Sequence, residues 1–174
     1  MELWEALLLG VVQGLAEFLP ISSDGHLALA AFLFDVKEAG LSFNVMLHAG
    51  TFLATAIVLR KQLWEAIRHG VAALRTPALF HSTPGGQDAL VIIGASIPTA
   101  LIGFTLRDAV EEWTLSPAAV GWGFLATAVI LVATRFARVG AIEHPSFRAA
   151  LLVGLAQGAA VLPGVSRSGS TIAM

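Results

Sequence analysis

The sequence contains no cysteine, and only 13% of its 174 residues are charged. The lack of cysteine excludes disulfide bonds, thiolate metal sites and a cysteine nucleophile, so any metal must be bound through oxygen or imidazole. Soluble domains carry about 25% charged residues, and this chain has about half of that share. The formal net charge is only −2, and no block of like charges occurs. Nucleic acid is therefore not an expected partner.

The sequence is rich in hydrophobic residues. They make up 56% of the chain, against about 45–50% in soluble domains. This composition predicts an integral membrane protein surrounded by membrane lipids. The N-terminus carries Glu2 and Glu5 and no basic segment, so we expect no cleaved signal peptide and assign the first helix to the mature protein.

The first apolar segments are too short to cross a membrane. Residues 3–19 and 27–34 are apolar and are separated by Pro20 and a polar turn, whereas a crossing needs about 20 residues. Non-helical backbone survives at membrane depth only when it is buried in protein or lines a watery cavity. Residues 1–34 are therefore predicted to form a re-entrant helix hairpin.

Three longer apolar segments follow within residues 43–134, at Phe43–Leu59, Ala89–Leu106 and Pro117–Thr134. We expect each to be a transmembrane helix. Lys and Arg collect in a predicted loop at 60–88 and in the segment 135–148, which predicts that both lie on the cytoplasmic side. The loops at 35–41 and 107–115 then face outward, and the first hairpin enters from outside.

An internal repeat sets the predicted architecture. A shift of 144 residues lays 150–158 on 6–14, Ser166 on Ser22 and Gly169 on Gly25. Three crossings separate the copies, so the second hairpin, which starts within 149–174, enters from the cytoplasmic side. The prediction is an all-α, polytopic membrane protein with inverted repeats. Such folds place their site near the midplane, where the broken helices meet.

The second hairpin carries an arginine among hydroxyls. Arg167 is surrounded by Ser166, Ser168, Ser170 and Thr171, at what reads as the start of a helix. Backbone N–H groups at a helix N-terminus bind anions, and a guanidinium grips phosphate oxygens in a bidentate fork. We therefore predict that this segment binds phosphate. The alternative is that the hydroxyls only cap the helix.

The first hairpin carries the acidic groups. Gln13 and Glu17 are four residues apart and share a helix face, which suits a hard cation such as Mg²⁺ or Ca²⁺. The alternative is an internal hydrogen bond from Glu17 to Arg167 or to the loop. His26 follows Ser23 by three residues, close enough to act as its base or to protonate a leaving group.

For several of these polar residues the alternative is a purely structural role. Ser22, Ser23 or Asp24 can cap the helix that follows, and a lone histidine is usually structural. His48 and Thr51 lie within the first predicted crossing, where they face either the polar cavity or a neighbouring helix.

These motifs resemble a known family, the undecaprenyl pyrophosphate phosphatases, also called bacitracin-resistance proteins. The matching residues are Gln13-x-x-x-Glu17, the run from Pro20 to His26, and Pro163-Gly164-Val165-Ser166-Arg167-Ser168-x-x-Thr171. The resemblance extends over the whole chain. It implies a hydrolase of the bacterial inner membrane that converts undecaprenyl pyrophosphate to undecaprenyl phosphate and inorganic phosphate. That reaction recycles the lipid carrier of peptidoglycan synthesis and confers resistance to the antibiotic bacitracin.

The resemblance also assigns roles to residues. It implies a divalent cation on Gln13 and Glu17, catalytic roles for Glu17, Ser23, His26 and Arg167, and a site open to the outer side. Phosphate binding falls on Ser22, Ser166, Arg167, Ser168 and Thr171. The protein is a possible homodimer. The motifs do not identify the nucleophile, the metal or the preferred prenyl chain length.

Two departures from the family pattern stand out. Gln13 replaces the first acid and leaves Glu17 as the only carboxylate of that pair, unless Asp24 helps. The resemblance also implies that the family continues for about 100 residues beyond residue 174, and the repeat assigns to that part a returning helix and three more crossings. The rival function is a polyisoprenyl-phosphate transporter or flippase, which needs the same anion site but no nucleophile.

Overall fold

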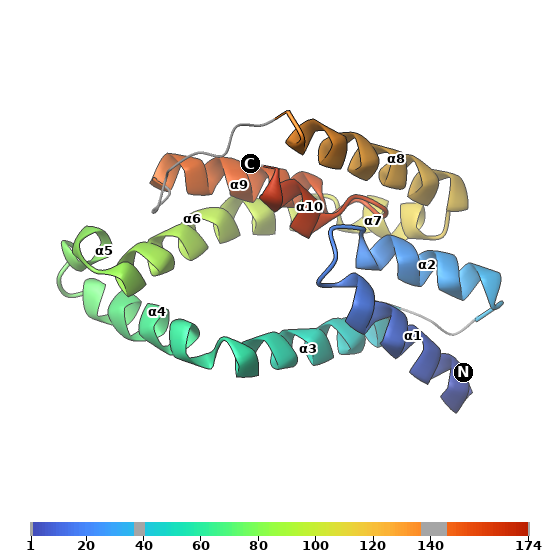
Figure 1. Ribbon diagram of the computed structural model, residues 1–174, viewed down its shortest axis with the longest axis horizontal. Coiled ribbons are helices and arrows are strands. Elements are labelled where there is room, and N and C mark those ends of the chain that lie inside the picture. Colours follow the sequence, from blue (N-terminus) through green and yellow to red (C-terminus); the bar gives the residue numbers. More distant parts are fainter. Residues whose placement is uncertain (1, 37–40, 137–145, 174) are drawn as a thin grey trace.

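The computed structural model describes residues 2–36, 41–136 and 146–173. Within these ranges the chain forms ten helices and no strand, which confirms the predicted all-α fold (Figure 1). The tertiary structure brings the N-terminal and C-terminal hairpins together beside α8.

The first hairpin consists of α1, Leu3–Ala16, and α2, Ser23–Leu33. Leu9 and Leu27 are almost fully buried between the two helices, with Ala30 and Val36 beside them. Ser22 caps α2, because its hydroxyl accepts a hydrogen bond from the Gly25 amide at 3.3 Å. The turn between the helices thus leaves the N-terminus of α2 at a fixed position.

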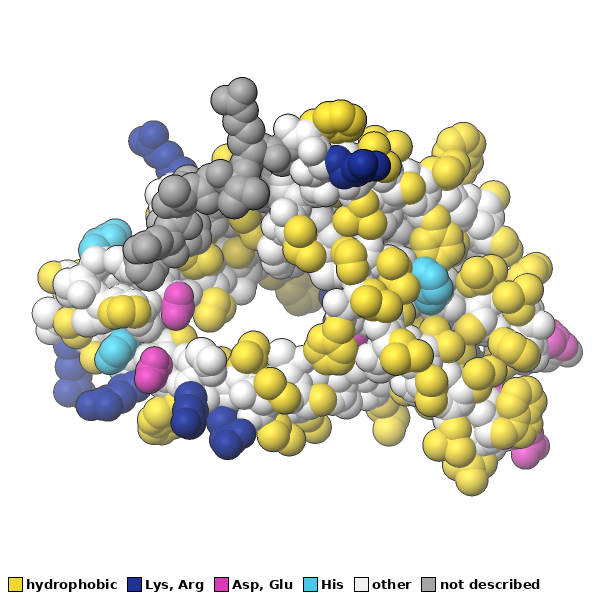
Figure 2. All heavy atoms as spheres, viewed as in Figure 1, with side chains coloured by type: hydrophobic (Ala, Val, Ile, Leu, Met, Phe, Trp, Pro, Cys, Tyr) yellow, Lys and Arg dark blue, Asp and Glu magenta, His cyan; other side chains and the backbone are white. Residues whose placement is uncertain are grey.

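The middle of the chain contains α3, Leu41–Val58, α4, Arg60–Ala73, α5, Leu79–Ser82, and α6, Pro84–Thr105. The segment 60–88 was predicted to be a loop, and this was wrong. Its residues form amphipathic helix α4, then α5 and the start of α6, because polar and apolar side chains alternate there with helical spacing. Figure 2 shows that Lys and Arg side chains gather at this end of the molecule.

The last helices are α7, Arg107–Thr114, α8, Pro117–Thr134, α9, Phe147–Ala159, and α10, Arg167–Ile172. The segment 107–115 was also predicted to be a loop and is largely helical. Helix α9 packs closely on α6, where the Thr99 hydroxyl donates to the Gly154 carbonyl oxygen at 2.9 Å. Residues 37–40 and 137–145, on which parts of two predicted loops fall, lie outside the described residues.

Two helices are long and apolar enough to cross a membrane, namely α6 and α8. A third crossing is counted only if α3 and α4, which meet at an 85° bend, form one span. Helices α1 and α9 are apolar but shorter, as expected for hairpins that do not cross. Large hydrophobic side chains are exposed over much of the surface (Figure 2). These features identify a membrane protein.

The helix bounds agree with the internal repeat. Helices α1 and α9 begin at residues 3 and 147, and helices α2 and α10 begin at residues 23 and 167, so both pairs differ by 144. Ser166 caps α10 as Ser22 caps α2, accepting a hydrogen bond from the Gly169 amide at 3.0 Å. Two distant parts of the sequence therefore adopt the same local fold. The inverted membrane topology stays a prediction.

Candidate functional site

A small polar pocket of about 60 Å³ lies between the two hairpins. The first hairpin contributes the turn before α2 and the first residues of that helix, and the second contributes the turn before α10. The lining residues are Ala16, Glu17, Ser22, Ser23 and Asp24 from the first hairpin, with Val165, Ser166, Arg167 and Ser168 from the second. The two predicted halves of the site therefore meet.

Glu17 is the centre of the acidic half of the pocket. Its Oε2 atom accepts a hydrogen bond from the Ser23 hydroxyl at 2.6 Å and another from the Gln13 amide nitrogen at 3.0 Å. Gln13 is only 1% exposed, because it lies on the same face of α1 one turn before Glu17. An internal hydrogen bond of Glu17, which was the alternative to a cation, is thus present, and its partner is Ser23 at the start of α2.

His48 of α3 joins this network from outside the hairpin. Its Nδ1 atom lies 2.7 Å from Gln13 Nε2, and its Nε2 atom lies 2.7 Å from Asp24 Oδ1. The imidazole of His48 thus connects Gln13 of α1 to Asp24 of α2 through its two ring nitrogens. Sequence reasoning noted His48 as a polar residue in an apolar helix but assigned it no part of the site. The signal was a lone histidine, and only the fold shows what it contacts.

Arg167 connects the two hairpins. Its Nη2 atom donates to Asp24 Oδ2 at 3.1 Å, and the two residues are 143 positions apart. A second link runs from the Ser168 hydroxyl to the Leu19 carbonyl oxygen, also at 3.1 Å. Both side chains of the ion pair are about two-fifths exposed, 45% for Arg167 and 37% for Asp24. The guanidinium therefore keeps donors available for an anion that enters the pocket.

Thr127 of α8 holds the second turn in place. Its hydroxyl donates to the Gly164 carbonyl oxygen at 2.8 Å and accepts from the Ser166 amide at 2.9 Å. Thr127 is 5% exposed, so these two bonds are shielded from water and satisfy backbone groups of an irregular segment. Sequence reasoning missed this residue, because one threonine in an apolar crossing gives no signal of its partner.

Glycine is required where the two turns touch. A Cβ atom on Gly25 would lie 2.8 Å from Gly164 Cα, and Gly164 itself has φ +86°. Gly164 thus combines a backbone conformation that other residues avoid with close contact to α8. The glycines of both motifs permit the backbones to approach, and this approach brings Arg167 next to Asp24.

His26 and Thr171 lie outside the pocket lining. The His26 Nδ1 atom is 2.8 Å from the Ser22 carbonyl oxygen, and its ring packs against Phe124 with centroids 4.9 Å apart. The Ser23 hydroxyl is directed to Glu17 and away from this ring. Thr171 donates to the Arg167 carbonyl oxygen and accepts from Gln157. Here His26 supports the turn around Ser22, which has φ 69°, and Thr171 supports α10.

One buried atom bears on the predicted cation. Gln13 Oε1 is buried and has no hydrogen-bond partner, which is the condition of an oxygen that a cation can satisfy. Among the described residues, no three His, Asp or Glu side chains converge on a common metal position. A cation held by Gln13 and Glu17 would therefore take its other ligands from water and phosphate, as Mg²⁺ commonly does.

Residues 6–174 match the family model described as Bacitracin resistance protein BacA. The chain belongs to this family. The polar pocket contains several of the residues through which the sequence resembled it, among them Glu17, Ser23 and Arg167, and they come from both ends of the matched range. The family assignment therefore covers both hairpins and the helices between them.

Curated relatives of the family match almost the whole chain. The chain is 40% identical over 175 residues to the undecaprenyl-diphosphatase of Korarchaeum cryptofilum (strain OPF8), covering 99% of this chain and 65% of that protein. It is 41% identical over 181 residues to the undecaprenyl-diphosphatase of Desulfosudis oleivorans (strain DSM 6200 / JCM 39069 / Hxd3), covering 99% and 66%. The chain thus spans about two-thirds of the length of these relatives.

Proposed function

We propose that the protein hydrolyses a polyprenyl diphosphate to the monophosphate and inorganic phosphate. The observation that supports this most strongly is the polar pocket between the hairpins, in which a guanidinium, serine hydroxyls and a carboxylate converge. Family membership and the relatives named undecaprenyl-diphosphatase support the same reaction. The substrate is then undecaprenyl diphosphate in the bacterial inner membrane, with the site open to the outer side, and turnover would give bacitracin resistance.

Phosphoryl transfer asks a protein mainly for positioning and charge neutralisation. Arg167, with Ser166 and Ser168 beside it, would bind the phosphate oxygens in the polar pocket, where the N-terminal ends of α2 and α10 meet. The Ser23 hydroxyl, or a water next to it, attacks the terminal phosphorus atom. The Glu17 carboxylate accepts the hydrogen bond of that hydroxyl at 2.6 Å and would take its proton.

The bond from the terminal phosphorus to the bridging oxygen breaks, and the prenyl monophosphate leaves. If Ser23 is the nucleophile, Glu17 gives its proton up to solvent, and water then cleaves the phosphoserine, with its hydroxyl going to phosphorus and its other proton to Ser23 Oγ, which restores the first state of the enzyme. The role of His26 as base or proton shuttle stays a prediction, as does the divalent cation on Gln13 and Glu17. Such a cation would neutralise charge on the diphosphate.

The test is phosphate release from a prenyl diphosphate by the purified protein in detergent, with and without EDTA. We expect release by the unsubstituted protein and its loss in EDTA. Phosphate release that persists in EDTA would show that the cation is not required, while the proposed hydrolysis would still be supported. If no phosphate is released under either condition, the hydrolase is wrong, and the rival function as a carrier of lipid phosphates is favoured.

A further inference from the structure

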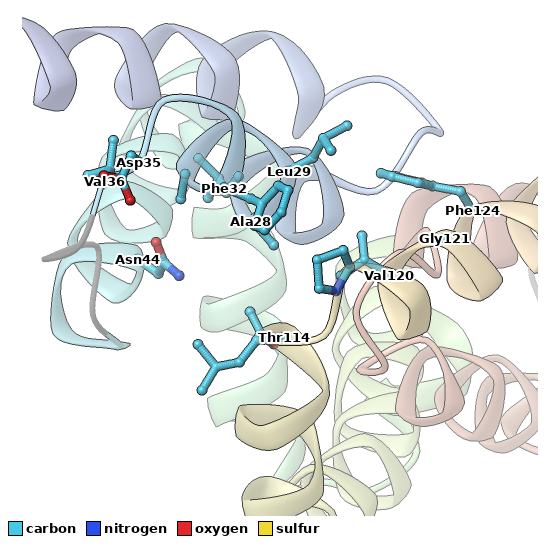
Figure 3. A pocket seen from close by; sticks show the side chains of 14 residues that line it. Ala28, Leu29, Phe32, Asp35, Val36, Asn44, Thr114, Val120, Gly121 and Phe124 are labelled. Carbon is cyan, nitrogen blue, oxygen red and sulfur yellow. The ribbon is translucent and has the colours of Figure 1, made fainter.

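A second, larger cavity lies further along α2. Its volume is about 460 Å³, and its walls come from α2, the start of α3, and α7 with α8. Figure 3 shows Ala28 and Phe32 on one side and Val120, Gly121 and Phe124 on the other. The walls are mostly apolar, and Asp35 and Asn44 lie at the end away from Phe124 (Figure 3).

Helix α2 connects this cavity to the polar pocket. Ser23 and Asp24 line the polar pocket, whereas Leu27 and Ala28 line the cavity. With a rise of about 1.5 Å per residue, Ala28 is only about 6 Å along the helix axis from Asp24. The border is His26, whose ring packs on Phe124, and Phe124 is part of the cavity wall. An anion site and an apolar space therefore follow one another along a single helix.

We propose that this cavity binds the isoprene units that follow the first one in the prenyl chain of the substrate. The inference rests on the proposed function, in which the substrate has a diphosphate head and an apolar chain. When the head is in the polar pocket, the chain has to leave it toward apolar surroundings, and the next two turns of α2 provide them. Ala28, Ala31 and Gly121 leave the room that the chain fills.

A rival cavity lies on another part of α8. It has a volume of about 320 Å³ and is lined by Trp113, Trp122 and Pro163 among others. It shares Val165 with the polar pocket, so it is a competing position for the chain. The larger cavity is preferred because it follows α2, whose N-terminal residues carry the proposed nucleophile.

The test fills each cavity and compares two substrates, farnesyl diphosphate and the short dimethylallyl diphosphate. Gly121→Leu fills the proposed cavity, since a Cβ at Gly121 meets no atom within 4 Å. Ala28→Phe is a second variant for the same cavity. Ala119→Trp fills the rival cavity, and Gly103→Leu is a control on α6, where a Cβ also meets no atom within 4 Å.

We expect Gly121→Leu and Ala28→Phe to raise KM for farnesyl diphosphate by about 10-fold, the scale of lost fit in an apolar pocket. The kcat value and the KM for dimethylallyl diphosphate should be unchanged, because the chain contributes equal binding to ground and transition states. An equal change with both substrates, no change with farnesyl diphosphate, or a selective effect of Ala119→Trp would overturn the inference.

Failure of the proposed function has a different signature. In that case the unsubstituted protein releases phosphate from neither substrate. Calorimetric binding of farnesyl diphosphate then decides the inference alone: weaker binding to Gly121→Leu than to Gly103→Leu supports the cavity, and equal binding overturns it.

Discussion

The two hairpins have the same local fold and opposite chemistry. Each contains an apolar helix, a turn and a second helix whose N-terminus is capped by a serine, Ser22 or Ser166. The first hairpin then supplies Glu17 and Asp24, and the second supplies Arg167. A repeat of one scaffold thus brings carboxylates from one copy and a guanidinium from the other to a common pocket.

The glutamines at equivalent positions show how the copies diverged. Gln13 is buried and contacts Glu17 and His48, whereas Gln157 is partly exposed and donates to Thr171 at 3.2 Å. The difference comes from the neighbours, because α3 brings a histidine to the first hairpin. Scaffold positions are therefore shared between the copies, but chemical roles depend on the helix that packs beside each one.

The largest effect is expected for Arg167 of the second hairpin. Arg167→Ala should lower kcat/KM for phosphate release by about 10³-fold, the scale seen when one donor to developing charge is removed. Arg148→Ala, at the exposed start of α9, should keep near-normal turnover. Near-normal turnover of Arg167→Ala in the same assay would refute the assignment of the second hairpin.

The acidic side should be the next most sensitive. Glu17→Gln keeps the shape of the side chain but removes the carboxylate that accepts from Ser23, so we expect kcat to fall by about 10²-fold. Glu65→Gln, on exposed α4, is the control. If Glu17→Gln changes only KM, Glu17 does not take the proton in the proposed reaction.

The equivalent glutamines provide a matched pair. Gln13→Leu removes the amide that donates to Glu17 and contacts His48 Nδ1, and we expect about a 10-fold loss of kcat/KM, since an unsatisfied buried polar group costs about 1–3 kcal/mol. Gln157→Leu removes only a contact near the surface and should change kcat/KM less than about 3-fold. Equal effects of the two substitutions would mean that the hairpins are equivalent.

The glycines test the contact between the turns through stability. Gly164→Ala should lower the free energy of unfolding by about 1–3 kcal/mol, because of its positive φ and because the added Cβ would meet the Val120 carbonyl oxygen and α8. Gly14→Ala should be neutral or slightly stabilising, because a Cβ there meets no atom within 4 Å. Thermal unfolding in detergent compares them, and a stable Gly164→Ala would contradict the close approach.

The smallest effect is expected at the ion pair itself. Asp24→Asn keeps only one of the two oxygens that contact His48 and Arg167, but partly exposed ion pairs contribute at most about 1 kcal/mol. We expect kcat/KM to change less than about 5-fold. A loss comparable to that of Arg167→Ala would show that Asp24 has a chemical role beyond the contact.

The sequence predicted the parts of the fold that depend on local pattern. Pro20 and Pro163 with their polar neighbours indicated the two turns, and the repeat placed α10 at the same register as α2. The helix 117–134 was predicted at its observed bounds. The loops predicted at 60–88 and 107–115 were wrong. Their charged residues suggested loops, but their apolar residues have helical spacing.

The site was predictable where residues of one motif act together. Glu17, Ser23 and Arg167 could be selected because polar groups in an apolar surround are costly. His48 and Thr127 could not be assigned, since their contacts depend on how α3 and α8 pack against the hairpins. The pairing of Ser23 with His26 was inferred from spacing alone and stays a prediction; the hydrogen bond of the Ser23 hydroxyl to Glu17 was not predicted.

The most direct test of the composite site is a double-substitution cycle across the two hairpins. The kcat/KM for phosphate release is measured for the unsubstituted protein, Glu17→Gln, Arg167→Lys and the double variant. Residues that act as one unit are non-additive, so we predict that the double variant is no slower than the slower single variant. A loss equal to the product of the two single losses would mean that the hairpins act independently and would contradict the account.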